Sequence, residues 1–403
     1  MRGIQPRGHL GWSLPSPSVF AARVAAPHTP SITASSISDL TSMSWFRAAA
    51  PRATHEVSVS EDHVLHVTEY GTPDGIPIVY LHGGPGGGTP PDARRLFDPE
   101  RFRVVLFDQR GCGKSVCGDR LHGNTTDRLL ADVEAVRAAL GIECWAVMGS
   151  SYGSLLTALY TVRHPSRVRF ALLHGVFLGS DAEVRWLYAE GGASMFYPEQ
   201  WAAFEAAAAA LQATPSPAPY HLGSPLNVPA ILAAYHGALV PPGVSRAHPP
   251  PATAANGGDG GDGGDGAVRE MHAAAAALAA WEDDMETLAP CAAPNDAAEL
   301  LAGAQIAAHH FLHGCFVPAE GALPELRAAR EILASLPCAI IHGRHDVICP
   351  PRAAAALHAA WPGSCLHIVE GGAHALFEKP MRAAAQACLV ELTSDLTGKR
   401  KRV

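Results

Sequence analysis

From residue 76 to residue 176 the chain alternates between short, continuously apolar runs and longer segments with helical spacing. Helical patterns occupy 125–141, where Gly141 is the expected C-cap, and 151–165, which Pro165 ends. Strands without polar alternation, separated by helices, predict a mostly parallel sheet covered by helices on both faces. The apolar runs are IPIVYLH (76–82), FRVVLFDQR (102–110), CWAVMG (144–149) and FALLHGV (170–176).

A β-hairpin is predicted before this region, because apolar and polar residues alternate across 55–70. The alternation of strand and helix patterns is interrupted between about residues 178 and 336, where Ala-rich helical segments dominate. Strand patterns return at PCAIIHGRHD (337–346) and SCLHIVEGGAH (364–374). The sequence therefore predicts an α/β domain interrupted by a helical insertion. Its expected parts are a first core segment (54–177), a helical cap (178–336) and a second core segment (337–398).

Two further segments are set apart from the fold by their composition. Residues 1–45 are rich in Arg and Ser, have no acidic residue before Asp39 and lack the apolar core of a secretory signal. This is the composition of a mitochondrial or chloroplast transit peptide, and the alternative is a disordered tail on a cytosolic protein. We therefore expect a cytoplasmic or organellar protein that is not secreted. The tract NGGDGGDGGDG predicts a flexible linker across residues 252–267.

Charge and composition exclude several other classes of function. The 403 residues include 30 Lys and Arg against 38 Asp and Glu, with no dominant basic block, so no nucleic-acid partner is expected. No apolar run reaches about 18 residues, so no membrane span is expected. The nine cysteines lack CxxC spacing, which favours free thiols. Cys349 is read as a small buried hydrophobe.

GSSYG (149–153) follows an apolar run and opens a helical pattern. It fits Gly-x-Ser-x-Gly, with Ser151 central and Ser150 as filler, and between a strand and a helix this pattern predicts a nucleophile elbow. The strained turn requires very small residues two positions before and after the serine. The alternative is a tight glycine-rich turn without chemistry. In the elbow, Ser151 lies at a helix N-terminus, where developing negative charge is favoured.

A serine hydroxyl is a weak nucleophile until a base accepts its proton. On this architecture the partners follow in the order Ser, Asp, His, each after a later strand. Asp346 follows AIIHG and His374 follows LHIVEGG. We predict that Asp346 orients His374 and that His374 accepts the Ser151 proton. The alternatives are a helix cap for Asp346 and an ordinary surface loop for His374.

The glycine-rich segment HGGPGGG (82–88) directly follows the apolar run IPIVYL. Glycines there let the main chain approach a substrate oxygen closely. The segment predicts an oxyanion hole formed by the N–H of Gly84, with Gly83 as the alternative, and the N–H of Tyr152. A plain Gly/Pro loop is the competing interpretation.

Two other patterns resemble a phosphate-binding loop and a metal site but do not meet the requirements of either. GCGKS (111–115) resembles the end of a phosphate-binding loop, but that motif requires glycine where Asp108 stands. His309 and His313 are spaced as a metal pair on a helix, yet no Glu lies between them and no third ligand is evident. We therefore expect no metal.

Together these motifs resemble the prolyl iminopeptidases, proline-releasing aminopeptidases of the α/β-hydrolase superfamily, from about residue 55 to residue 396. The resemblance implies an α/β-hydrolase fold with a helical cap, release of N-terminal proline from peptides through an acyl-enzyme, and no cofactor. The family's catalytic serine, aspartate and histidine fall on Ser151, Asp346 and His374. The segments that carry the resemblance are LHGGPGGG (81–88), FDQRGCGKS (107–115), GSSYGS (149–154), HGRHDVICP (342–350) and WPGSCLHIVEGGAH (361–374).

The resemblance also implies acidic cap residues that bind the substrate's free amino group, and aromatic residues around the proline. Glu282 matches one family glutamate, with a solvated helix face as the alternative. Phe177 matches a pocket aromatic, with core packing as the alternative. The chain departs from the family pattern at Tyr152 in place of Trp, at Trp186-Leu187-Tyr188 in place of Trp-Tyr-Tyr, and at Ala307 in place of a second cap glutamate.

The glutamate missing at Ala307 leaves the preference for a free N-terminal proline open. Glu190, Asp283 and Asp284 are candidates to compensate for it. Three functions are compared on this basis. A proline-releasing serine peptidase is favoured, a carboxylesterase or amidase of relaxed specificity is the alternative, and a non-catalytic ligand-binding relative is disfavoured by the intact serine, aspartate and histidine.

Overall fold

The computed structural model describes residues 44–212, 230–242, 244, 246–247, 263–288 and 296–394. The predicted leader lies outside these residues except for its last two positions, and so does most of the predicted linker 252–267. The last residues of that linker are helical, because helix α7 begins at Gly263. Packing of the later turns against α8 outweighs the weak helix propensity of glycine there.

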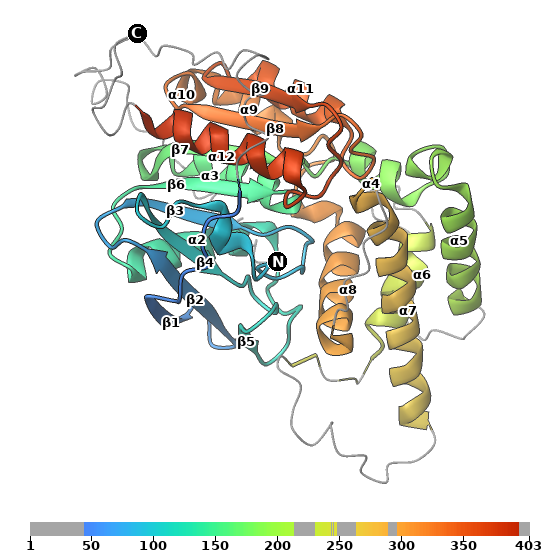
Figure 1. Ribbon diagram of the computed structural model, residues 1–403. Coiled ribbons are helices and arrows are strands. Elements are labelled where there is room, and N and C mark those ends of the chain that lie inside the picture. The colour runs from blue at the N-terminus through green and yellow to red at the C-terminus, as the bar shows by residue number, and fades with distance from the viewer. Residues whose placement is uncertain are drawn as a thin grey trace, which may run out of the picture.

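The described part of the chain forms a nine-stranded sheet (Figure 1). The order of its main path is β1-β2-β4-β3-β6-β7-β8-β9, and β5 pairs with β2. Neighbouring strands are parallel from β4 to β9, whereas β2 is antiparallel to β1, β4 and β5. The strands are β1 (Ala53–Ser58), β2 (His63–Gly71), β3 (Ile76–Leu81), β4 (Phe102–Phe107), β5 (Val116–Cys117), β6 (Trp145–Ser150), β7 (Val168–His174), β8 (Cys338–Gly343) and β9 (Ser364–Val369).

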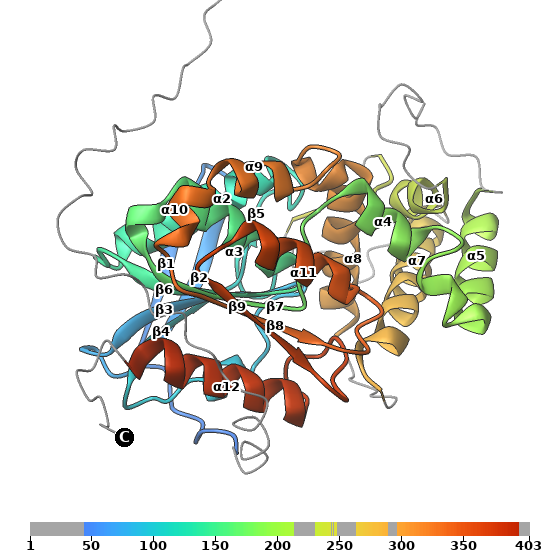
Figure 2. The same cartoon turned by 90° about the horizontal axis from the view of Figure 1, so that it is seen from above.

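Helices cover both faces of the sheet, as the apolar runs predict. Figure 2 shows α12 on one face and α2, α3 and α11 on the other. The helices are α2 (Thr126–Ala139), α3 (Tyr152–Arg163), α4 (Asp181–Tyr188), α5 (Pro198–Gln212), α6 (Ala230–Leu239), α7 (Gly263–Glu286), α8 (Ala297–Leu312), α9 (Leu323–Ala328), α10 (Arg330–Ala334), α11 (Pro351–Ala360) and α12 (Lys379–Ser394).

The two faces carry separate apolar clusters, which explains why the strand sequences do not alternate. Ile78 and Tyr80 of β3 pack in the cluster beneath α12, whereas Val79 and Leu81 belong to the cluster shared with α3. All four side chains are nearly inaccessible to solvent. A central strand that is covered on both sides needs an apolar residue at every position.

Helices α4 to α10 lie in the sequence between β7 and β8, and α5 to α8 stand together beside the sheet (Figure 1). Aromatic rings hold this group together. The Phe204 ring stacks on Tyr235 at 4.5 Å and on Trp281 at 5.6 Å between centroids. Within the described residues, no helix is long and apolar enough to cross a membrane.

The strand order places the loops that matter for chemistry at one edge. From β3 the chain passes to β4 on one side, and it later returns to β6 on the other side of β3. The loops after β3 and β6 therefore diverge at a topological switch point, where open α/β sheets bind ligands. The loops after the parallel strands β8 and β9 end at the same edge. The predicted strands and hairpin are confirmed, while the two-residue β5 was not predicted.

Candidate active site

Ser151 lies at the junction between β6 and α3, in a backbone conformation that side chains rarely adopt (φ 56°, ψ −124°). Its neighbours must be glycine. A Cβ on Gly149 would lie 2.0 Å from the Gly153 carbonyl oxygen, and one on Gly153 would lie 2.1 Å from the Leu81 oxygen. Both serines line the cavity, but the Ser150 hydroxyl is hydrogen-bonded to His174 Nδ1 at 2.7 Å. The geometry of an elbow is therefore present, with Ser151 at its tip.

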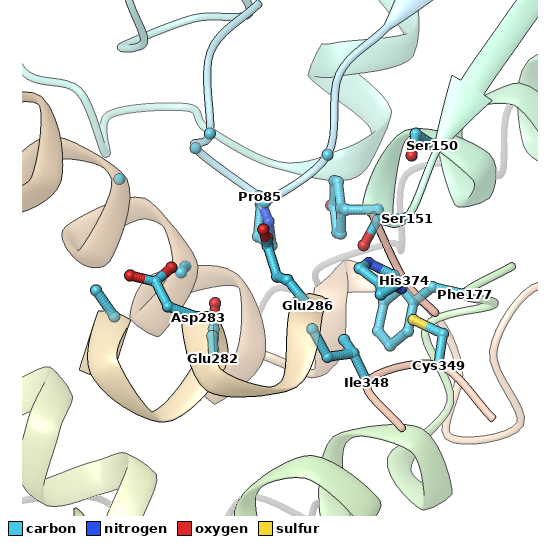
Figure 3. A pocket seen from close by; sticks show the side chains of 18 of the residues that line it. Pro85, Ser150, Ser151, Phe177, Glu282, Asp283, Glu286, Ile348, Cys349 and His374 are labelled. Carbon is cyan, nitrogen blue, oxygen red and sulfur yellow. The ribbon is translucent and has the colours of Figure 1, made fainter. Parts of the chain in front are cut away.

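Asp346 and His374, from the loops after β8 and β9, meet beside this serine. His374 Nδ1 lies 2.8 Å from Asp346 Oδ2. The other carboxylate oxygen accepts the backbone N–H of Cys349 at 2.8 Å, so the carboxylate is fixed in orientation. Figure 3 shows the Ser151 hydroxyl directed toward the His374 ring. Residues that are far apart in the sequence thus converge on one point.

Burial and charge act in opposite directions on this pair. Burial favours neutral His374, but the adjoining Asp346 carboxylate, with Glu286 and Glu282 farther out, raises the pKa of the imidazole. Burial likewise opposes ionisation of Asp346, yet His374 and His342 hold the pKa of this carboxyl below its usual value. The result is an ionised Asp346 beside an imidazole that is a stronger base than usual.

The glycine-rich loop after β3 forms part of the cavity wall. Its residues Gly83 and Gly84 line the cavity together with Ser151 and Tyr152. The segment FDQRGCGKS braces this loop, a role that sequence reasoning did not assign. Gln109 donates its backbone N–H to His82 Nε2 at 3.0 Å and its side-chain N–H to the His82 carbonyl at 2.9 Å.

Asp108 completes this brace. Its two oxygens accept the backbone N–H groups of Thr89 and Lys114, each at 2.9 Å. The aspartate that excludes a phosphate-binding loop is thus a structural cross-link between the two loops.

The cavity has a volume of about 380 Å³, and its lining includes residues of the inserted helices α4, α7 and α8. Phe177 lines it, and its ring lies 6.2 Å from Tyr152 and 6.1 Å from Phe311. Ala307 lies in the wall on α8, buried and with no polar side-chain atom. The position of Phe177 is thus compatible both with contact to a substrate in the pocket and with packing in the core.

Glu282 points into the cavity from α7 and accepts a hydrogen bond from the Tyr188 hydroxyl. Burial raises the pKa of Glu282 to about 7, and the charges of Glu286 and Asp283 act in the same direction. The Tyr188 hydroxyl and His374 oppose this shift. Glu282 is therefore partly neutral near pH 7, unlike a carboxylate on a solvated helix face.

Of the three residues considered as substitutes for the missing glutamate, only Asp283 lines the cavity. Glu190 and Asp284 lie outside its lining. Glu286, one helical turn after Glu282, also lines the cavity and was not singled out from the sequence. The spacing of four residues on one helix was the signal that could have identified it.

Tyr152 ties the elbow to the inserted helices. Its hydroxyl lies 2.8 Å from Thr126 Oγ1 and 2.9 Å from His310 Nδ1 on α8. The other ring nitrogen of His310 lies 3.0 Å from Asn124 Oδ1. A buried hydroxyl at this position is thus fully paired, which accounts physically for tyrosine where the family usually has tryptophan.

Cys349 is buried, as the sequence suggests, but it also contacts the Ser151 hydroxyl. Burial raises the pKa of the Cys349 thiol well above its usual value. The thiol is therefore protonated at neutral pH and does not compete with the serine as a nucleophile.

Comparison with known proteins agrees with this architecture. A family model described as the alpha/beta hydrolase fold matches residues 76–380, so the chain is an α/β hydrolase. A proline iminopeptidase-related protein from Thermus thermophilus has a similar fold, with a TM-score of 0.51 at 19% identity over 86% of this chain and 98% of its own.

Curated relatives define the family more narrowly. The proline iminopeptidase of Neisseria gonorrhoeae is 35% identical over 341 residues, which cover 84% of this chain and 94% of the relative. That of Arabidopsis thaliana is 36% identical over 338 residues, covering 83% and 78% respectively. The chain belongs to the proline iminopeptidase family.

Proposed function

We propose that this protein is a serine aminopeptidase that releases N-terminal proline from peptides, with Ser151 as nucleophile, His374 as general base and Asp346 as its orienting carboxylate. The observation that carries the proposal is the convergence of an elbow serine with a buried Asp–His pair beside a cavity lined by several acidic side chains. Family membership supports the same activity and peptide substrates.

The proposed acylation step uses these three side chains. His374 accepts the Ser151 proton as the hydroxyl oxygen attacks the carbonyl carbon of the N-terminal residue. Asp346 holds Nδ1 of the ring, which leaves Nε2 as the nitrogen that accepts the serine proton, and it stabilises the imidazolium that forms. The raised pKa of His374 makes this proton transfer more favourable.

The developing oxyanion lies between the glycine-rich loop and the start of α3. The backbone N–H of Gly84, or that of Gly83, and the N–H of Tyr152 are assigned as its donors. Fixed donors of this kind stabilise the transition state more than the ground state. The imidazolium then donates its proton to the leaving peptide amine, and water hydrolyses the prolyl ester by the same steps in reverse.

The cavity lining suits the first residue of a peptide. Residues of α4, α7 and α8 line it together with Ser151, so this residue would lie between the serine and these helices. The rings of Phe177 and Phe311 offer an apolar wall for the pyrrolidine, while carboxylates on α7 offer a partner for its cationic nitrogen.

A panel of anilides tests the proposal. We expect free proline anilide to be cleaved with a kcat/KM far above those for alanine anilide and N-blocked proline anilide. Ser151→Ala should abolish all three reactions. Equal turnover of the free and blocked substrates would instead favour a carboxylesterase or amidase of relaxed specificity.

A further inference from the structure

The proposed reaction fixes where the substrate's cationic nitrogen must lie. In a residue whose carbonyl is attacked, the amino nitrogen is about 2.5 Å from the carbonyl carbon, because only the Cα separates them. The cation is therefore held close to Ser151 and His374. A carboxylate that binds it must lie in the same part of the cavity.

Two carboxylates other than Asp346 lie close enough to His374 to raise its pKa, namely Glu282 and Glu286. Both extend from the last turns of α7 and line the cavity. In Figure 3, Glu286 reaches toward Pro85 of the glycine-rich loop, whereas Asp283 points away from this loop. Glu299 also lines the cavity, but from the first turn of α8.

Of Glu282 and Glu286, Glu282 is the less suitable as the sole partner of a cation. Its carboxylate already accepts the Tyr188 hydroxyl, and burial raises its pKa to about 7. Near neutral pH a substantial fraction of Glu282 is therefore uncharged. A buried ammonium needs a full compensating charge within hydrogen-bonding reach.

Glu286 has the position and the backbone support to supply that charge. Its carbonyl oxygen accepts the backbone N–H of Ala375 at 2.9 Å, which fixes the end of α7 to the loop that carries His374. The facing wall on α8 includes Gly303, Ala304 and Ala307, which carry no charge.

We propose that Glu286 binds the cationic amino group of the substrate together with Glu282, and so is a specificity-determining residue of this chain. This inference rests on the proposed aminopeptidase activity. Glu286 supplies from α7 the negative charge that a glutamate at the position of Ala307 would supply from α8.

The test compares Glu286→Gln with wild type on proline 4-nitroanilide and on 4-nitrophenyl acetate, an ester without an amine. The amide keeps the size of the side chain and removes its charge. We expect kcat/KM for the anilide to fall about 10- to 100-fold, as for a lost hydrogen bond to a charged group, mainly through KM. The ester should be hydrolysed within about twofold of wild type. Asp284→Asn on the same helix, outside the cavity, is the matched control and should leave both rates unchanged.

A second variant supplies a gain of function. Introducing Ala307→Glu into Glu286→Gln returns a carboxylate to the cavity from α8, and we expect it to restore part of the lost kcat/KM for the anilide. Unfolding curves establish that each variant is folded.

Each outcome decides a different claim. A Glu286→Gln enzyme that keeps wild-type activity on the anilide, or loses anilide and ester activity equally, overturns the role of Glu286. A wild-type enzyme that hydrolyses the ester but not the anilide overturns the proposed function, and the inference with it.

Discussion

Tyr188→Phe removes one hydroxyl from the cavity wall and leaves the aromatic packing in place. The Tyr188 ring lies 5.1 Å from Phe311 and 6.4 Å from Phe204 between centroids, contacts that phenylalanine keeps. What is lost is the hydrogen bond to Glu282. Because that hydroxyl stabilises the ionised carboxylate, its removal raises the pKa of Glu282 further.

The magnitude follows from the strength of the lost bond. A hydrogen bond to a charged group contributes about 1.5–3 kcal/mol, and one pKa unit corresponds to about 1.4 kcal/mol. Starting from a pKa of about 7, a rise of about 1.5 units lowers the ionised fraction of Glu282 at pH 7.5 from about three quarters to about one tenth. We therefore expect kcat/KM for proline anilide to fall several-fold at pH 7.5 and to recover at pH 9.

The assay is kcat/KM for proline anilide between pH 6 and pH 10, with an amine-free ester measured in parallel. The substrate's own ammonium titrates equally for both enzymes and cancels in their ratio. Tyr235→Phe is a matched control, since its hydroxyl donates to the Phe204 carbonyl within the cap and not to the cavity. An unshifted anilide profile, or the same shift with the ester, would refute the electrostatic role given to Glu282.

Three further substitutions test other parts of the structure. Asp346→Asn should lower kcat by about 10⁴-fold, because the amide no longer enforces the required tautomer of His374 and removes the charge that raises its pKa; stopped assays at high enzyme concentration measure the residual rate. Gly149→Ala should cost about 3 kcal/mol or more of stability, read from urea unfolding, since its Cβ would overlap the Gly153 carbonyl. Asp132→Ala should destabilise the fold by about 3–5 kcal/mol in the same assay, because it leaves the buried Arg110 guanidinium without its bidentate partner.

The sheet and the elbow were predictable because their signals are local. A strand covered on both faces must be apolar at every position, and the elbow needs Gly149 and Gly153 at fixed spacing. Chain order also pointed to Asp346 and His374, because the loops after parallel strands end at the same edge of a sheet, and these two side chains lie 2.8 Å apart there.

The cavity walls were not predictable to the same degree, because they depend on how α7 and α8 face each other. Nothing in WEDDMETL separates Glu286 from Asp284 by composition, yet only the former lines the cavity. The brace formed by Asp108 likewise joins segments whose contact no periodicity encodes.

The identity of the nucleophile is tested most directly by mapping the adduct of a fluorophosphonate by mass spectrometry, alongside proline anilide cleavage. Labelling is predicted on the peptide that contains Ser151, in proportion to the loss of activity. Ser151→Ala should neither label nor cleave, while Ser150→Ala should still label. An adduct on another residue, or cleavage that survives in Ser151→Ala, would contradict the account.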